Sequence, residues 1–171
     1  LRVVAKDAPG SKVLLPRPYY YSYPHNVALA WLIPIYTDLK KGKIDIADFK
    51  QKALECRAVL INSPSNPTGT VQEVETLKEI ESFCEQHGIF IISDEVYKDL
   101  IYVRGNYLLH GKKVITVNSF SKTYAMCGMR VGYIYSKNRD VIDTAVEMKS
   151  HTSMNTSLVG QAMALAAMGE R

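Results

Sequence analysis

Residues 119–130 read Ser-Phe-Ser-Lys-Thr-Tyr-Ala-Met-Cys-Gly-Met-Arg, and the rest of the fold is organised around them. The stretch follows the apolar run Val114–Val117, which is typical of a buried strand, and precedes a second strand-like run, Val131–Tyr135. Lys122 therefore stands between two segments that are expected to be buried. Lysine is rarely buried without a partner, because removing its charge from water is costly.

A covalent bond to an aldehyde would explain a lysine in this position. A Schiff base makes the amine part of a conjugated system, and Ser119, Ser121 and Arg130 supply two hydroxyl groups and one cation suited to a phosphate. An aldehyde that carries a phosphate is pyridoxal 5′-phosphate (PLP), so this stretch predicts a PLP site. Taken alone, Lys122 would be interpreted as a lysine in a surface loop. The other motifs of the chain decide between this interpretation and a PLP site.

Composition narrows the classes of function. The chain has 171 residues, enough for one domain with a core, and 47% of them are hydrophobic. The net charge of +4 comes from interleaved lysines and carboxylates, and no apolar run approaches a membrane span, so neither nucleic acid nor a membrane is an expected partner. The three cysteines are far apart and the four histidines are scattered, so we expect no metal site and a reducing, cytoplasmic setting.

Apolar strands alternate with helical patterns along the chain. Strands are expected at Val13–Leu15, Ile33–Thr37, Ala58–Ile61, Ile89–Ile92, Val114–Val117 and Val131–Tyr135. This alternation predicts an α/β fold, a three-layer sandwich with a mixed, mostly parallel sheet in which Val131–Tyr135 is antiparallel.

The expected helices have recognisable boundaries. They cover Leu1–Ala5, Val27–Trp31, Asp45–Glu55, Asn138–Ser150 with Asn138 as its cap, and Leu158–Met168. One more helix is expected to begin at a Thr70/Glu73 capping box and to end at Gly88, and Arg17–Pro24 is expected to be a loop.

Polar residues follow three of the expected strands, where ligands bind in sheets of this kind. Asn66 lies in a proline-bracketed turn after Ala58–Ile61, Asp94 ends Ile89–Ile92, and Lys122 follows Val114–Val117. A carboxylate beside the ring nitrogen of PLP keeps that nitrogen protonated, which suits Asp94. Asp94 alone could equally be the N-cap of a helix, and Asn66 alone could serve only to form the turn.

Two tyrosines extend this candidate site. Tyr97 lies three residues after Asp94, and its hydroxyl could bond the phenolic oxygen of the cofactor. Tyr20 offers a flat ring that could stack on a pyridine. Because the chain has eleven tyrosines, spacing alone does not single out Tyr20, and Tyr97 could also be a tyrosine packed at a sheet edge.

Three motifs together carry a family resemblance: Asn66-Pro-Thr-Gly69, Asp94-Glu-Val-Tyr97, and Ser119-Phe-Ser-Lys122 through Gly128-Met-Arg130. In this order they resemble the class I/II, fold-type I, PLP-dependent aminotransferases, and most of all their aspartate and aromatic aminotransferase branch. Each motif alone is modest, but the resemblance spans nearly the whole chain.

The resemblance implies a role for each candidate residue. Lys122 would hold PLP as the internal aldimine and then move the substrate proton, and Asp94 would pair with the pyridinium nitrogen. The other implied roles are contacts with the cofactor. Asn66 and Tyr97 would bond O3′, and Tyr20 would stack on the ring face. Ser119, Ser121 and Arg130 would bind the phosphate. The implied reaction transfers an amino group between an amino acid and a 2-oxo acid, in a homodimer.

The resemblance also implies what lies outside the chain. Residues 1–171 match most of a PLP-binding large domain, incomplete at both ends, with 151–171 starting the connection towards a small domain. The family's glycine-rich phosphate loop is expected before Leu1, and the arginine for the substrate carboxylate after Arg171, so the 171 residues alone are expected to be inactive. Trp31-Leu32 departs from the family, which usually has Gly-Gly there, and so do Cys127 and Met129.

Two alternatives stay open at this point. A PLP-dependent C–S β-lyase on the same scaffold would share the early chemistry, so the candidate residues do not separate it from an aminotransferase. An aminotransferase-like ligand-binding domain of a transcription regulator would need a DNA-binding segment, and nothing within the 171 residues favours one.

Overall fold

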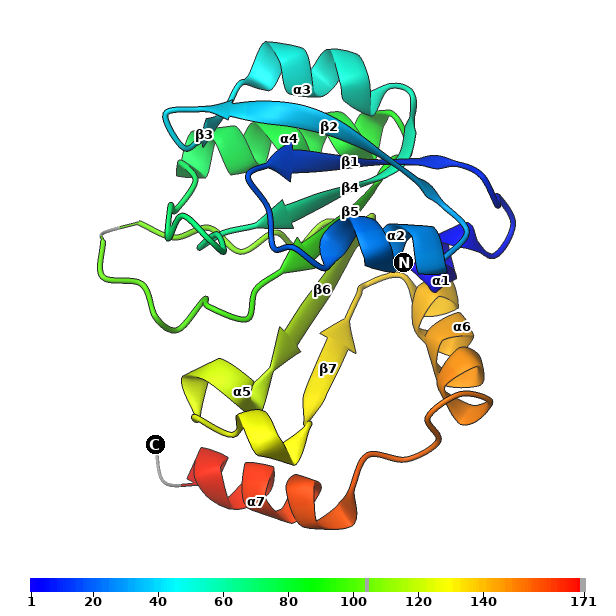
Figure 1. The fold of residues 1–171 in the computed structure, drawn as a ribbon, viewed down its shortest axis with the longest axis vertical. Coiled ribbons are helices and arrows are strands. Elements are labelled where there is room, and N and C mark those ends of the chain that lie inside the picture. The colour runs from blue at the N-terminus through cyan, green and yellow to red at the C-terminus, as the bar shows by residue number, and fades with distance from the viewer. Residues whose placement is uncertain (104, 170–171) are drawn as a thin grey trace.

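The computed structural model describes residues 1–103 and 105–169 of the chain. One sheet of seven strands runs through it in the order β3-β2-β1-β4-β5-β6-β7 (Figure 1). The strands are β1 (Lys12–Arg17), β2 (Ile33–Lys40), β3 (Lys43–Ile44), β4 (Cys56–Asn62), β5 (Phe90–Asp94), β6 (Val114–Ser119) and β7 (Gly132–Tyr135). The helices are α1 (Arg2–Ala5), α2 (Tyr23–Leu29), α3 (Ile46–Ala53), α4 (Val74–Gln86), α5 (Phe120–Thr123), the 3₁₀ turn η1 (Cys127–Met129), α6 (Arg139–Ser150) and α7 (Leu158–Gly169).

The direction of the strands confirms the predicted mixed, mostly parallel sheet. β2, β1, β4, β5 and β6 pair in parallel, whereas β3 and β7 at the two edges are antiparallel to their neighbours. The antiparallel β7 is the Val131–Tyr135 run of the sequence. No helix in the described ranges is long and apolar enough to cross a membrane.

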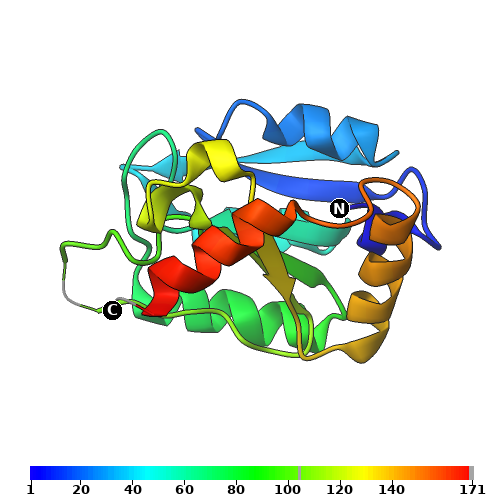
Figure 2. The ribbon, with the colours of Figure 1, turned by 90° about the horizontal axis from the view of Figure 1, so that it is seen from below.

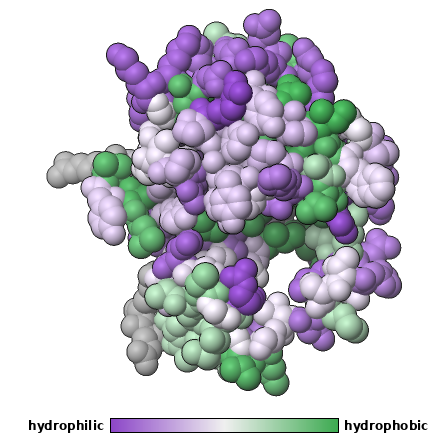
Figure 3. Space-filling model, viewed as in Figure 1, coloured by the Kyte–Doolittle hydropathy of each residue, from purple (hydrophilic) through white to green (hydrophobic). Residues whose placement is uncertain are grey.

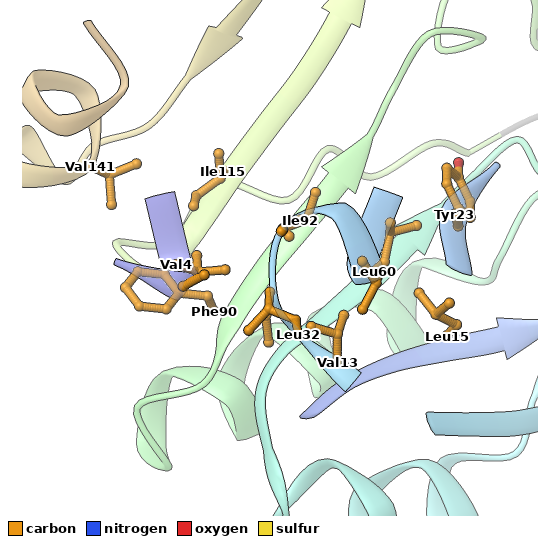
Figure 4. Packing of buried hydrophobic residues seen from close by; sticks show 14 residues of the cluster. Val4, Val13, Leu15, Tyr23, Leu32, Leu60, Phe90, Ile92, Ile115 and Val141 are labelled. Carbon is orange, nitrogen blue, oxygen red and sulfur yellow. The ribbon is translucent and has the colours of Figure 1, made fainter. Parts of the chain in front are cut away.

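Both faces of the sheet are covered, which makes the fold three-layered. Successive side chains of a strand point to opposite faces, so Val13 and Leu15 belong to one core cluster and Leu14 to the other. The first cluster lies under α1, α2 and α6 and is shown in Figure 4. The second lies under α3 and α4, where Phe49 and Leu77 are fully or almost fully buried.

β1 is longer than predicted, because it continues through Pro16 to Arg17. β4 pairs with β1 only as far as Leu14, whereas β2 follows β1 to its end, with Thr37 opposite Pro16. The missing N–H of Pro16 therefore lies beyond the β4 ladder and breaks no bond there.

The expected Arg17–Pro24 loop is also shorter than predicted, since α2 already begins at Tyr23 with Pro24 in its first turn. Proline fits there because the first N–H groups of a helix have no partner inside it. The helix ends at Leu29, so Trp31 lies outside it and has a left-handed backbone with φ of 62°.

The predicted Thr70/Glu73 capping box is wrong. α4 begins at Val74, and Glu73 occupies the cap position without a side-chain hydrogen bond. The preceding residues are held by β3 instead, because the side chain of Gln72 accepts a hydrogen bond from the backbone N–H of Ile44. β3 has only two residues and leaves no recognisable pattern in the sequence. The sequence therefore gives no sign that Gln72 bonds to β3 and that the helix starts later than the capping box predicts.

Two predicted helix boundaries are confirmed. The side chain of Asn138 accepts hydrogen bonds from the N–H groups of Asp140 and Val141 at the start of α6. Gly88 follows α4 with a φ of 69°, a left-handed conformation that glycine adopts without strain.

The β7 edge is much less covered than the rest of the sheet. All four residues of β7 are exposed, although its sequence pattern predicted burial. α7 packs against the start of β7 through Gly160, where a Cβ atom would lie 2.8 Å from Val131 (Figures 1 and 2). Other apolar side chains of α7 stay exposed, among them Leu158 and Leu165, and hydrophobic surface shows at this lower end of the molecule (Figure 3).

Candidate active site

A cavity of about 240 Å³ lies where β4, β5 and β6 end. Because these strands are parallel neighbours, their carboxyl ends meet at one edge, and the register places Asn62 beside Asp94 and Asp94 beside Val117. All the residues predicted for the site line this cavity: Tyr20, Asn66, Asp94, Tyr97, Ser119, Ser121, Lys122 and Arg130. Four further residues complete the lining: Tyr23, Asn62, Val96 and Cys127.

Asp94 is the last residue of β5 and is half-buried. The hydroxyl of Tyr23 donates to its Oδ2 at 2.7 Å, and the N–H of Val96 donates to its Oδ1 at 3.3 Å. Burial raises the pKa of Asp94, and these two donors offset part of that effect. Asp94 is not a helix cap, because Val96 lies in a turn and no helix follows β5 directly.

Asn62 ties two parts of the site together. Its Nδ2 donates to the backbone carbonyl of Asp94 at 3.0 Å, and its Oδ1 accepts from the N–H of Asn66 at 2.7 Å. Asn66 in turn donates from Nδ2 to the hydroxyl of Tyr97 at 3.4 Å. The amide and the phenol that were predicted to act together therefore lie within hydrogen-bond distance.

Lys122 lies on the short helix α5, directly after β6. Its Nζ is over the ring of Tyr97, 5.6 Å from the ring centre, so the amine is directed at the cavity. The side chain is exposed, and the premise that Lys122 is buried between two strands is wrong. The chain turns out of the sheet at Ser119, because its hydroxyl caps α5 by accepting from the N–H of Ser121 at 3.2 Å, and this turn carries Lys122 to the rim.

Arg130 approaches the cavity from the β7 edge, whereas Ser119 ends β6 and Ser121 lies on α5. The guanidinium of Arg130 is exposed and donates from Nη1 to the carbonyl of Cys127 at 2.9 Å. The backbone of Arg130 is left-handed, with φ of 54°, and the chain then enters β7 at Gly132. A Cβ atom at Gly132 would lie 2.9 Å from the carbonyl oxygen of Asn118, so glycine permits the close approach of β7 to β6.

Tyr20 lies at the opposite wall, on the segment between β1 and α2. Its ring contacts the ring of Tyr23 edge to face, with centroids 5.6 Å apart and planes at 76°. The ring of Tyr21 also contacts the ring of Tyr20, with centroids 4.7 Å apart and planes at 62°. Tyr20 still lines the cavity, so the structure brings it to the predicted site.

Three kinds of comparison with known proteins agree with this geometry. A model of the family described as "Aminotransferase class I and II" matches residues 2–171. The chain belongs to this family.

Its relatives are enzymes about twice as long or longer. A probable aspartate/prephenate aminotransferase of Aquifex aeolicus is 43% identical over 136 residues, which are 73% of this chain and 34% of that protein. The aspartate aminotransferase of Geobacillus stearothermophilus is 35% identical over 169 residues, which are 92% of this chain and 43% of that protein. The chain thus spans less than half the length of these class I and II aminotransferases.

Solved structures of the family have the same fold. An aspartate aminotransferase of Thermotoga maritima superposes with a TM-score of 0.90 at 29% identity, covering 98% of this chain and 47% of that one. An aromatic aminotransferase of Pyrococcus horikoshii gives a TM-score of 0.86 at 32% identity, covering 97% of this chain and 47% of that one.

The donor set in the cavity fits the cofactor that the family implies. PLP has an aldehyde, a basic ring nitrogen, a phenolic oxygen and a phosphate. The cavity presents an amine, a half-buried carboxylate, an amide beside a phenol, and a guanidinium with two hydroxyls, in the order Lys122, Asp94, Asn66 with Tyr97, and Arg130 with Ser119 and Ser121.

Sequence reasoning missed Tyr23 and Asn62. Tyr23 contacts a carboxylate 71 positions away, and no local pattern announces such a pair. Asn62 stands four residues before Asn66, and its side chain bonds the backbone N–H of Asn66. Asparagine side chains often bond the backbone of a nearby turn, so an asparagine just before the proline-bracketed turn is a sequence feature that could have identified Asn62.

Proposed function

We propose that the protein transfers an amino group between an amino acid and a 2-oxo acid with PLP as its cofactor. The observation that carries the proposal is the convergence of Lys122, Asp94, Asn66 and Tyr97 on one cavity at the carboxyl ends of parallel strands. The relatives' names support amino-group transfer over β-elimination, because they are named as aminotransferases.

Each residue has a task that follows from its chemistry. The amine of Lys122 would hold the aldehyde carbon of the cofactor and, once free, act as the base that moves a proton at the α-carbon of the amino acid. Its place over the Tyr97 ring supports this role, because an exposed amine at the rim reaches both the cavity and an entering substrate.

Asp94 would face the ring nitrogen of the cofactor. When bound, PLP supplies a protonated pyridine ring that withdraws electrons from the α-carbon of the substrate. Asp94 would keep that nitrogen protonated by accepting its hydrogen bond, since both carboxylate oxygens retain acceptor capacity beside the donors Tyr23 and Val96.

The remaining residues orient the cofactor. Asn66 and Tyr97 would donate to its phenolic oxygen, and Tyr20 would cover one face of its ring. Arg130, Ser119 and Ser121 would bind the phosphate, with the cation supplying most of the electrostatic attraction.

The setting of the protein is also part of the proposal. We propose that residues 1–171 form the greater part of a PLP-binding large domain, which is supported by superposition of 98% of the chain on 47% of a relative. We further propose a homodimer in the cytoplasm. The three cysteines are free in the structure, which suits a reducing compartment.

The decisive experiment fixes PLP to the protein with borohydride. The full chain mixed with PLP should develop a visible absorption band, and reduction should attach the cofactor to the peptide that contains Lys122. Lys122→Ala should lose the label, whereas Lys98→Ala, which changes a lysine paired with Asp99, should keep it. Labelling of another lysine in the wild-type protein would contradict the assignment.

A second assay separates transfer from elimination. It uses the longer protein that the family resemblance implies, in which amino acids should convert 2-oxo acids to new amino acids and thioether amino acids should release no pyruvate. Pyruvate release without transfer would identify the C–S β-lyase reaction instead.

A further inference from the structure

Two protein donors reach the carboxylate of Asp94 within the described ranges: the hydroxyl of Tyr23 and the N–H of Val96. We propose that Tyr23 is a positioning residue, whose hydroxyl orients Asp94 and keeps it ionised for the ring nitrogen of the cofactor. This inference rests on the proposed function and assigns a task to a residue outside the three motifs of the family resemblance.

The position of Tyr23 is rigid. Its ring is 6% exposed and belongs to the core cluster under α2, as Figure 4 shows. Val27, one turn further along α2, is fully buried in the same cluster. Because the ring is held by the core, the hydroxyl at its tip has one place to point, and that place is Oδ2 of Asp94 at 2.7 Å.

The core itself does not require the hydroxyl. A phenylalanine ring would bury the same apolar surface, and a buried hydroxyl is favourable only when it has a partner. The partner is a residue of the cavity, at the end of strand β5 and 71 positions further along the chain than Tyr23 on helix α2. The phenol therefore links the core to the site, and a purely structural tyrosine would not need this geometry.

The hydroxyl acts on the charge of Asp94. Burial raises the pKa of Asp94, which favours the neutral acid, whereas a donor to the carboxylate favours the anion. Burial and the nearby Asp94 charge also raise the pKa of Tyr23, so its phenol stays protonated and remains a donor. Without this bond, Asp94 would keep one longer bond to the N–H of Val96, at 3.3 Å.

The bond does not compete with the cofactor. Tyr23 occupies Oδ2 and Val96 occupies Oδ1, and each carboxylate oxygen can accept more than one hydrogen bond. One acceptor direction is therefore left for a ring N–H from the cavity.

The test compares PLP with its carbocyclic analogue, in which a C–H group replaces the ring nitrogen. Both ligands have the same aldehyde and phosphate, so they differ only at the atom that Asp94 faces. Binding to the full chain is measured by absorbance titration for wild type and Tyr23→Phe. We expect Tyr23→Phe to weaken PLP binding about tenfold, the effect of one lost bond to a charged group, and to change binding of the analogue less than about twofold.

Tyr107→Phe is the matched control. Tyr107 donates from its hydroxyl to the carboxylate of Glu81, outside the cavity, so this change removes the same kind of bond without touching Asp94. Both ligands should bind Tyr107→Phe as they bind wild type.

Each remaining outcome has one meaning. An equal loss of both ligands in Tyr23→Phe would show a structural role and overturn the inference. If Tyr23→Phe does not fold, Tyr23→4-aminophenylalanine keeps a donor at the same reach and must discriminate between the ligands as wild type does, and failure to do so would also overturn it. A wild-type chain that binds neither ligand through Lys122 would instead contradict the proposed function.

Discussion

β5 and β7 are both neighbours of β6, but their surroundings differ. β5 lies between two core clusters, and four of its five residues are buried. β7 is exposed along its whole length, and the apolar side chains Tyr133, Ile134 and Tyr135 are each more than 40% exposed. The candidate site lies between them, with Asp94 at the end of β5 and Arg130 just before β7.

The difference shows how the site divides its tasks. The residues on the β5 side are held by hydrogen bonds to the packed part of the fold, as Asp94 is by Tyr23 of α2 and Asn66 by Asn62 of β4. On the β7 side, Lys122 and Arg130 are exposed. In the proposed function, the groups that would be aimed at the cofactor ring are thus built on the rigid side, and the groups that would bind its aldehyde and phosphate on the open side.

A pair of isoleucines gives the largest expected contrast. Ile91 on β5 is fully buried, whereas Ile134 on β7 is 42% exposed. Ile91→Ala should lower the free energy of unfolding by about 2–5 kcal/mol, because it leaves a cavity in the core. Ile134→Ala should cost less than about 1 kcal/mol. Urea unfolding measures both, and equal losses would show that β7 is as well packed as β5.

Asp94→Asn should have the next largest effect, on turnover. An amide does not hold the proton on a ring nitrogen as a carboxylate does, so amino transfer by the longer protein that the family resemblance implies should fall by about one to two orders of magnitude. Asp143→Asn on α6 changes an exposed carboxylate paired with Arg139 and should leave turnover unchanged. Wild-type turnover in Asp94→Asn would contradict the role proposed for Asp94 on the β5 side of the site.

The same variant tests the cost of the buried charge in the cofactor-free protein. The pKa of Asp94 is raised in the folded state, chiefly by burial, so the folded protein binds the proton more tightly than the unfolded chain. Wild type should therefore lose stability relative to Asp94→Asn as the pH rises through the unfolded and then the folded pKa. A difference in stability that does not change with pH would contradict this.

Trp31→Gly should increase the stability of the well-packed side of the sheet. Trp31 has a left-handed backbone and is 77% exposed, so it is strained and contributes little burial. Glycine should raise the free energy of unfolding by up to about 1 kcal/mol, since it adopts this conformation freely but loses more chain entropy. Leu29→Gly, at an exposed helical position nearby, should instead lower it by about 1 kcal/mol.

Glu81→Gln should have the smallest effect on stability. Glu81 lies on α4, and its carboxylate binds the segment that connects β5 to β6. Burial alone would raise the pKa of Glu81, but donors from Tyr107, His110 and Gly111 outweigh it and the pKa is lowered. The carboxylate therefore stabilises the fold above its ordinary pKa, and this contribution is lost as the pH falls through the lowered value. Glu81→Gln should cost less than about 1 kcal/mol at pH 7, because solvent screens the site, and nothing in strong acid. Glu75→Gln, at an exposed position on the same helix, is the matched control and should change the free energy of unfolding at pH 7 by less than about 0.5 kcal/mol.

Much of the site could be predicted because its chemistry is local in sequence. Asp94 ends an apolar strand, and Asn66 and Lys122 each follow the end of one within four residues. Parallel strands bring their carboxyl ends together whatever the details of packing. The class of fold follows from the same alternation of strands and helices. The short β3 and the true start of α4 could not be predicted, since they depend on Gln72 bonding to Ile44 28 residues earlier.

The sequence by itself therefore determined the fold class, the family resemblance and eight of the twelve residues that line the cavity, because periodicity and strand-end motifs are properties of short segments. Only the tertiary structure decided the pairing of Tyr23 with Asp94, the bridge made by Asn62 and the exposure of Lys122 and β7. Hydrogen bonds between distant segments and the burial of a strand depend on what packs beside it. No local pattern contains that information.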